Sequence, residues 1–123
     1  MIKTIDTKNA PAAVGPYSQA KLVNGFLYTS GQLPMYVDGT MPEGIETQTL
    51  ASIANVKAIL DEAGYTFEDV VKTTCFLSEI ANFGTFNKIY EEYFVSKPAR
   101  SCFAVKDLPK GALVEIEVIA YKD

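Results

Sequence analysis

The chain of 123 residues contains no histidine, a single arginine and only two cysteines. Without histidine, Ser-His-Asp triads, Cys-His pairs and histidine-based metal sites are excluded together. Cys75 and Cys102 are too few for a disulfide framework, lie far apart in sequence and lack metal-ligand spacing. No stretch approaches the roughly 20 apolar residues of a membrane span, and residues 1–6 lack the apolar core of a signal peptide. We therefore expect a cytoplasmic protein without a metal site or a membrane partner.

Positive charge is also scarce. Eleven lysine and arginine residues against 15 acidic ones give a net charge of −4, and no basic run occurs. Phosphate neutralisation supplies most non-specific affinity for nucleic acid, so a nucleic-acid partner is not expected. Hydrophobic residues make up 48% of the chain, which indicates a globular protein. The length fits a single domain, 1–123, with one core.

Turn-forming residues divide the first half of the chain. Residues 2–5 are predicted to form a short strand, and the proline- and glycine-containing segment 9–19 a structured loop. Asn24-Gly25 separates two strand-like segments, 20–24 and 26–30, and predicts a β-hairpin.

Helical periodicity appears next. Apolar residues recur at helical spacing over 46–63, and Gly64 is a natural C-terminal stop. Residues 70–77 are rich in β-branched side chains and predict a strand, in which Cys75 is expected to be a core residue.

A second helix is predicted from residue 82 to about residue 94, with Asn82 as its N-cap. Asn87 lies off the aromatic stripe of this helix. Packing of the stripe against the sheet is favoured over stacking on a ligand. Its members are Phe83, Phe86, Tyr90 and Tyr93.

The C-terminal quarter of the chain predicts two strands that carry the candidate site. Side chains alternate between faces, so Arg100 and Cys102 share one face of the first strand and Glu115 and Glu117 one face of the second. If the apolar stripes of both strands pack on the same core, these four residues lie together on the remaining face.

Arg100 is the only arginine beside ten lysines. A guanidinium grips a carboxylate or phosphate through two parallel hydrogen bonds, which an ammonium group cannot do. We consider two alternatives for this residue, an anion-binding role or an ion pair with Glu115 or Glu117 at an interface. For Glu117 an interface ion pair or a solvated position is favoured over a catalytic role.

Several motifs together resemble the RidA family, also called YjgF, over nearly the whole chain. They are residues 9–19 (NAPAAVGPYSQ), 29–34 (TSGQLP), 55–60 (NVKAIL), 71–74 (VKTT), 98–102 (PARSC), 108–109 (LP) and 114–117 (VEIE).

The resemblance implies an α+β fold similar to chorismate mutase, a mixed sheet with two helices on one face. It also implies a homotrimer with sites in the clefts between subunits. Independently, a sheet covered on one face only leaves its other face to be buried by oligomerisation. The implied activity is hydrolysis of 2-imino acids, reactive enamine and imine intermediates of pyridoxal-phosphate enzymes, to 2-keto acids and ammonia.

Roles follow from the resemblance residue by residue. Arg100 matches the carboxylate-binding arginine and Glu115 the glutamate that orients water. Cys102 matches a substrate-contacting position and is not expected to be a nucleophile. The positions that match pocket-lining residues are Tyr17, Ser30, Gly31 and Asn87. Imine hydrolysis by these groups needs no metal or organic cofactor.

One segment departs from the family pattern, and two alternative functions remain. Only residues 95–97 connect the second helix to Pro98, fewer than in many members, which bears on the size of the substrate.

One alternative is a non-catalytic trimer that senses keto acids and acts through a protein partner. The other, a ribonuclease or translation inhibitor, is disfavoured by the acidic balance and the missing histidine.

Overall fold

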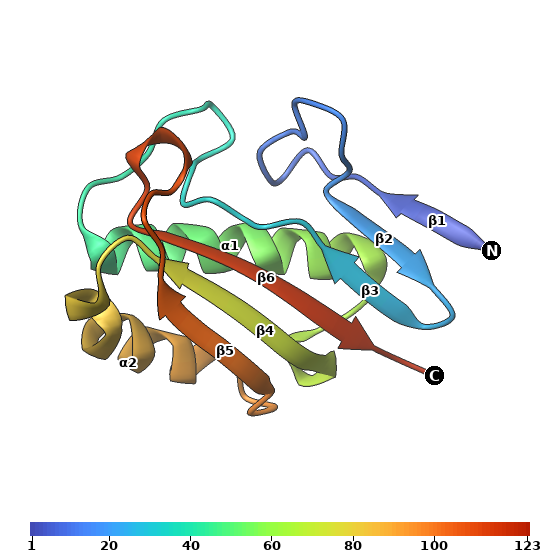
Figure 1. Ribbon diagram of the computed structural model, residues 1–123. Helices are drawn as coiled ribbons and strands as arrows, with labels where there is room; N and C mark the ends of the chain where they lie inside the picture. The colour runs from blue at the N-terminus through green and yellow to red at the C-terminus, as the bar shows by residue number, and fades with distance from the viewer.

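The computed structural model describes residues 1–123 and contains one six-stranded sheet and two α-helices (Figure 1). The elements in chain order are β1 Ile2–Ile5, β2 Ala20–Val23, β3 Phe26–Thr29, α1 Ile45–Ala63, β4 Val70–Leu77, α2 Phe83–Tyr93, β5 Ala99–Ala104 and β6 Val114–Tyr121. Short 3-10 helices span Phe67–Asp69, Ile80–Asn82 and Pro109–Gly111.

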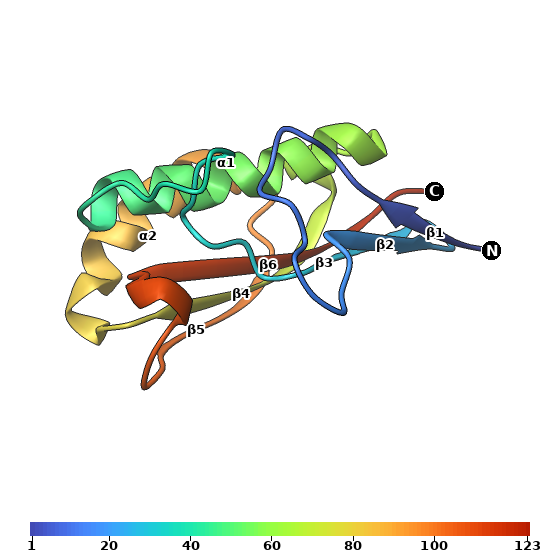
Figure 2. The same ribbon diagram turned by 90° about the horizontal axis from the view of Figure 1, so that it is seen from above.

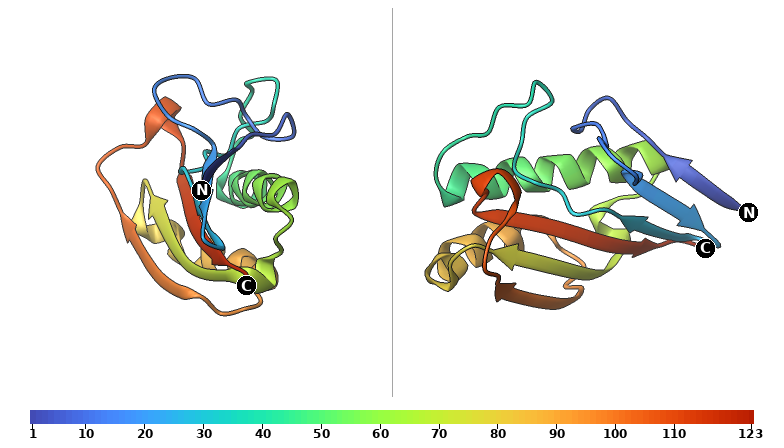
Figure 3. Two further views of the ribbon diagram at one scale, coloured as in Figure 1. Left: turned by 90° about the vertical axis from the view of Figure 1, so that its right-hand side faces the viewer. Right: turned by 45° about the horizontal axis from the view of Figure 1, so that its top comes forward.

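The strands follow the order β1-β2-β3-β6-β4-β5. All neighbours are antiparallel except β4 and β5, which are parallel and are connected through α2. Both helices lie on one side of the sheet (Figure 2), and no helix covers the other side (Figure 3). The mixed sheet with two helices on one face, expected from the sequence, is confirmed.

The hairpin predicted at Asn24-Gly25 joins β2 and β3. Both turn residues have positive φ, 50° at Asn24 and 83° at Gly25, the conformation that a two-residue hairpin turn of this type requires. A Cβ atom at Gly25 would lie 2.3 Å from the carbonyl oxygen of Lys122, so glycine is also required by the close approach of the C-terminal segment.

The helices begin and end near their predicted limits. Helix α1 ends at Gly64, which adopts the left-handed conformation with φ 82°. Asn82 occupies the N-cap position of α2, as predicted, but its side chain makes no capping hydrogen bond. Asn82 itself has helical backbone angles and continues a preceding 3-10 turn into α2, so its side chain is not placed at a free helix end.

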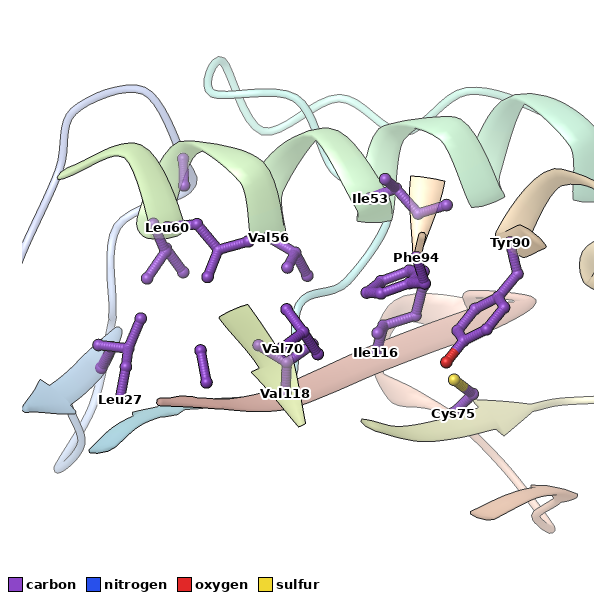
Figure 4. Close-up of a cluster of buried hydrophobic side chains, with 14 of the residues drawn as sticks. Leu27, Ile53, Val56, Leu60, Val70, Cys75, Tyr90, Phe94, Ile116 and Val118 are labelled. Atoms are coloured by element: carbon purple, nitrogen blue, oxygen red, sulfur yellow. The ribbon is translucent and has the colours of Figure 1, made fainter. Parts of the chain in front are cut away.

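The core fills the space between the helices and the sheet (Figure 4). From the aromatic stripe of α2, Phe86 and Tyr90 are buried in this core, which confirms the packing role of the stripe. Cys75 is also fully buried there, as expected. Complete burial of a side chain as large as Phe86 is worth about 1.5–3 kcal/mol relative to leaving it exposed. Neither helix combines the length and apolar character needed to cross a membrane.

Candidate active site

Arg100, the second residue of β5, points toward α2. Its Nη1 donates a hydrogen bond of 2.6 Å to Oδ1 of Asn87. The guanidinium carbon lies 4.8 Å from the ring centroid of Tyr90 and 5.5 Å from that of Phe83. Two aromatic rings and one amide therefore fix the orientation of the guanidinium plane.

No carboxylate neutralises Arg100. The only ion pair in the structure joins Lys57 to Asp61, and Asn87 accepts the only hydrogen bond that the guanidinium donates within the chain. A guanidinium carries five N–H donors, so most of them are left for a ligand. The alternative that Arg100 pairs with Glu115 or Glu117 is not realised within one chain.

A pocket of about 610 Å³ opens beside Arg100. Asn87 and Tyr90 line it from α2, and Val95 and Lys97 from the short connection to β5. Two residues of this short connection therefore border the pocket beside Arg100. Lys97 has a φ of 51°, so this three-residue connection makes its turn through a backbone conformation that most side chains avoid.

Cys102 lies two residues after Arg100 on the same face of β5 and is half-buried. The neighbouring Cys75 thiol and the positive charge of Arg100 lower the pKa of Cys102 to about 7, although partial burial opposes them. A thiolate is therefore well populated at this position near neutral pH.

Gly31 and Glu115 form a second group, on the other side of the sheet. A Cβ atom at Gly31 would lie 2.3 Å from Oε2 of Glu115. A side chain at residue 31 would displace the end of the flexible Glu115 side chain, so glycine allows the carboxylate to occupy this position.

The segment after Gly31 is held against β6 and α1 by hydrogen bonds. The backbone N–H of Gln32 donates to the carbonyl oxygen of Ile116 at 2.8 Å, and the N–H of Ile116 donates back to Gln32 at 3.2 Å. The hydroxyl of Ser52 donates to the carbonyl oxygen of Gln32 at 2.6 Å. The Asn55 amide donates to the carbonyl oxygens of the following residues 33 and 35 at 3.0 and 2.8 Å. These contacts fix Gly31 beside Glu115.

Tyr17 and Ser30 lie near this second group. Tyr17 is 53% exposed and, with Gly31, lines a small pocket of about 90 Å³. The hydroxyl of Ser30 donates to the carbonyl oxygen of Ser18 at 2.6 Å. Ser30 thereby joins the end of β3 to the N-terminal loop that carries Tyr17.

Glu115 is half-buried on β6. Burial and the nearby negative charge of Glu117 raise the pKa of Glu115 above its ordinary value. A carboxyl group with a raised pKa exchanges a proton more readily at near-neutral pH, which suits a general base or acid.

The prediction that Arg100, Cys102, Glu115 and Glu117 share one face of the sheet is wrong. Arg100 pairs in register with Thr73 of β4, and Cys102 pairs with Cys75, both on the helix-covered face. Glu115 pairs with Phe76 and lies on the open face. Strand β5 is an edge strand whose Arg100 and Cys102 side chains turn toward α2, while Phe103 points to the open side, 45% exposed.

The structure therefore divides the predicted residues into two half-sites. The Arg100 half-site contains Arg100, Cys102 and Asn87. The Glu115 half-site contains Glu115, Gly31, Ser30 and Tyr17, with Glu117 beside Glu115.

Supporting residues were not found from the sequence. Ser52 and Asn55 of α1 are buried and hold the Gly31 segment. Gln19, only 2% exposed, accepts a hydrogen bond of 2.7 Å from the backbone N–H of Thr7 and donates to the carbonyl oxygen of Pro11 at 2.9 Å, and so shapes the loop of Tyr17. Ser52 and Asn55 are polar residues at helical positions that face the core. Because buried polar groups are almost always hydrogen-bonded, their positions could have indicated a structural hydrogen-bonding role.

Sequence comparison connects this arrangement with known proteins. The family model described as Endoribonuclease L-PSP matches residues 7–122. A Lactococcus lactis protein whose name proposes a regulator, AldR, is 52% identical over 122 residues, 97% of each chain. An Escherichia coli K12 protein named 2-iminobutanoate/2-iminopropanoate deaminase is 44% identical over 127 residues, 99% of each chain.

Solved structures resemble the whole chain. The Yersinia pestis protein YyfA, described as a member of the Rid protein family, superposes with a TM-score of 0.96 at 51% identity, covering 99% of this chain and 100% of that one. Escherichia coli TdcF with bound serine superposes with a TM-score of 0.94 at 38% identity, covering 98% and 99%.

Proposed function

Since the chain belongs to the RidA (YjgF) family, we propose that it is a 2-iminobutanoate/2-iminopropanoate deaminase. Such an enzyme hydrolyses the reactive enamine and imine intermediates released by pyridoxal-phosphate enzymes to 2-keto acids and ammonia. The observation that carries the proposal is Arg100, an oriented guanidinium with unused donors at a pocket and no carboxylate partner in the chain.

The substrate carboxylate binds Arg100. Two parallel charge-assisted hydrogen bonds fix its plane, and the contacts of Arg100 with Asn87 and Tyr90 mean that the fork is ordered before the ligand arrives. The bound serine in the related TdcF structure is a small molecule with a carboxylate of this kind.

Glu115 performs the proton transfers. It accepts a proton from a water molecule as the water oxygen attacks the carbon of the protonated imine, which gives a neutral carbinolamine. It then gives this proton to the amine nitrogen. As the C–N bond breaks, the carboxylate takes the proton of the carbinolamine hydroxyl, and ammonia and the 2-keto acid leave. Its raised pKa supports both directions of transfer, and the absence of a side chain at Gly31 leaves room for the carboxylate.

One chain does not bring Arg100 and Glu115 to the same substrate, because the sheet separates them. We place the active site between two copies of the chain, with the Arg100 half-site of one copy and the Glu115 half-site of the next. Three such contacts close into a homotrimer with three sites.

The open face of the sheet supports this assembly. Its strands carry aromatic side chains that are 38–45% exposed in the single chain: Phe26, Tyr28, Phe103 and Tyr121. Apolar surface of this extent on the face of a sheet is typical of an interface. Burial of the face in a trimer accounts for residues that a monomer would leave in water.

Enzyme kinetics test the proposal directly. A threonine or serine dehydratase generates the imine, and the rate of imine loss is followed with and without this protein. Wild type accelerates the loss, and Arg100→Ala abolishes the acceleration while the assembly persists by light scattering. No acceleration by well-folded wild-type protein would contradict the deaminase proposal.

A ligand-sensing function is the second candidate, and the name of the Lactococcus lactis relative favours it. A sensor uses the same carboxylate clamp for a keto acid but turns nothing over. If the protein binds 2-oxobutanoate through Arg100 but hydrolyses no imine, the sensing function is supported over the deaminase function.

RNA cleavage, the activity in the name of the matching family model, has less support in this chain. The net charge is −4 with no basic run, which disfavours binding of a nucleic acid, and without histidine no histidine acid-base pair is available.

A further inference from the structure

Cys75 and Cys102 are direct partners across β4 and β5. The two strands are parallel, and the residues pair in register on the helix-covered face. Neighbouring strands lie about 4.7–4.9 Å apart, which falls inside the range of about 4.4–6.8 Å that Cα atoms span in disulfides. The two cysteines are therefore far apart in the sequence but adjacent in the folded sheet.

The two thiols differ in exposure and acidity. Cys75 is fully buried, and its Sγ lies 3.9 Å from Oγ1 of Thr73, to which it donates. The neighbouring Cys102 sulfur and burial raise the pKa of Cys75. Cys102 is half-buried beside Arg100, and its pKa is lowered to about 7. Solutes therefore reach a thiolate at Cys102, while Cys75 stays protonated and shielded behind it.

We propose that Cys102 and Cys75 form a reversible redox pair, in which a hydroperoxide oxidises Cys102 and Cys75 converts the product to an intrachain disulfide. In the first step the Cys102 sulfur attacks a peroxide oxygen, the O–O bond breaks, and the departing oxygen takes a proton and leaves as water or an alcohol. Cys102 becomes a sulfenic acid, and the peroxide is reduced by two electrons.

In the second step the Cys75 sulfur attacks the Cys102 sulfur. The S–O bond of the sulfenic acid breaks, and the hydroxyl group leaves with the Cys75 proton as water. Two thiols and one hydroperoxide thus give one disulfide, one water and one further water or alcohol. The register of β4 and β5 holds the attacking sulfur beside its target, so no other thiol is needed.

The pair protects the Arg100 half-site, a consequence that rests on the proposed function. Without Cys75, further oxidation gives an irreversible sulfinic acid at Cys102. That group is anionic and lies two residues from Arg100 on the same face, where it competes with the substrate carboxylate. A disulfide is neutral, and a thiol reductant restores both cysteines.

Intact-mass analysis of the full chain tests the chemistry. Wild type, Cys75→Val and Cys102→Ser are treated with a small molar excess of hydrogen peroxide, and circular dichroism checks that each variant is folded. Wild type is expected to lose about 2 Da, the two thiol hydrogens, and dithiothreitol restores the mass. Cys75→Val is expected to gain about 32 Da at Cys102 without recovery.

Peptide mapping without reductant decides the connectivity, and wild type alone suffices if a variant fails to fold. A peptide pair that links Cys75 to Cys102 supports the proposal. It is overturned if wild type gains about 32 Da with no linked pair, since Cys75 is then only a packing residue, or if the disulfide joins two chains.

Imine hydrolysis gives a separate readout. After peroxide and then dithiothreitol, wild type recovers most of its activity, and Cys75→Val remains inactive. If untreated wild type hydrolyses no imine, the proposed function is contradicted. The mass measurement does not depend on enzyme activity and still tests the cysteine pair.

Discussion

Arg100 and Glu115 lie on opposite faces of one sheet, with only β4 between their strands. Arg100 reaches α2 on the covered face, and Glu115 lies beside Gly31 on the open face. Each half-site is internally ordered by hydrogen bonds or close packing, and each lacks what the other supplies. A cleft between two copies unites a carboxylate clamp with a proton-transfer group.

Arg100→Lys is expected to weaken substrate binding although it keeps the positive charge. Lysine loses the planar fork and at least one charge-assisted hydrogen bond, worth about 1.5–3 kcal/mol. We therefore expect kcat/KM for imine hydrolysis to fall by about 10- to 100-fold, mainly through KM. Steady-state kinetics check this. Wild-type kinetics in Arg100→Lys would show that bidentate recognition plays no part.

Gly31→Ala is expected to reduce kcat on the order of 100-fold, because the new methyl group displaces the Glu115 carboxylate. The fold persists, since the displaced atoms are the end of a flexible side chain. Gly84→Ala is the matched control. Its Cβ meets nothing within 4 Å, and alanine in α2 raises the free energy of unfolding by up to about 1 kcal/mol. Equal activity of the two variants would contradict the assigned position of Glu115.

Tyr90 carries two separable roles. Its hydroxyl forms a buried hydrogen bond of 2.7 Å with Thr73, and its ring lies against the Arg100 guanidinium. Tyr90→Phe is expected to lower the free energy of unfolding by about 1 kcal/mol with KM unchanged. Tyr90→Leu is expected to raise KM several-fold as well, through loss of the cation-π contact of about 0.5–2 kcal/mol.

Urea denaturation and kinetics on the same preparations separate these effects. Tyr93→Phe is the control, because the Tyr93 hydroxyl makes no hydrogen bond to protein, and it is expected to change stability by less than about 0.5 kcal/mol. A raised KM in Tyr90→Phe would show that the Thr73 contact, rather than the ring, orients Arg100.

Glu115 gives stability a specific pH dependence. Because its pKa is raised in the folded chain, its acid form favours folding. That contribution is complete below the ordinary glutamate pKa of 4.5 and is lost as pH rises through the folded-state pKa. Glu115→Gln should therefore have a higher Tm than wild type at pH 7, and the difference should disappear at about pH 4.

Carboxyl NMR titration tests the cause. Glu117→Gln removes the neighbouring charge, so the pKa of Glu115 should fall toward its ordinary value but remain above it, since burial is the larger cause. A Tm difference that grows as the pH falls would contradict the sign of the effect.

Local signals predicted the elements well. Asn24-Gly25 required a tight hairpin, and Gly64 ended α1 in the left-handed conformation, because both depend on a few neighbouring residues. The motif residues of the resemblance also fall into two ordered half-sites. The hydrogen bonds from Ser52 and Asn55 that support one half-site join segments far apart in the sequence, so they were not predictable from neighbouring residues.

The relative orientation of the two C-terminal strands was not predictable in the same way. Alternation sorts the side chains of each strand into two sets, but it does not say which set of one strand lies with which set of another. The register through β4 decides this. Phe103 lies on the open face against Phe76, at 5.6 Å between ring centroids, while Arg100 faces the helix side.

Subunit mixing tests the site between copies most directly. Arg100→Ala and Glu115→Ala chains, each inactive alone, are unfolded together, refolded in equal amounts and checked for mixed trimers by native mass spectrometry. A site that takes Arg100 from one copy and Glu115 from the next is intact in about a quarter of random pairings. We expect about a quarter of the wild-type rate of imine hydrolysis. Verified mixed trimers without recovered activity would place both residues in one chain's site and contradict the account.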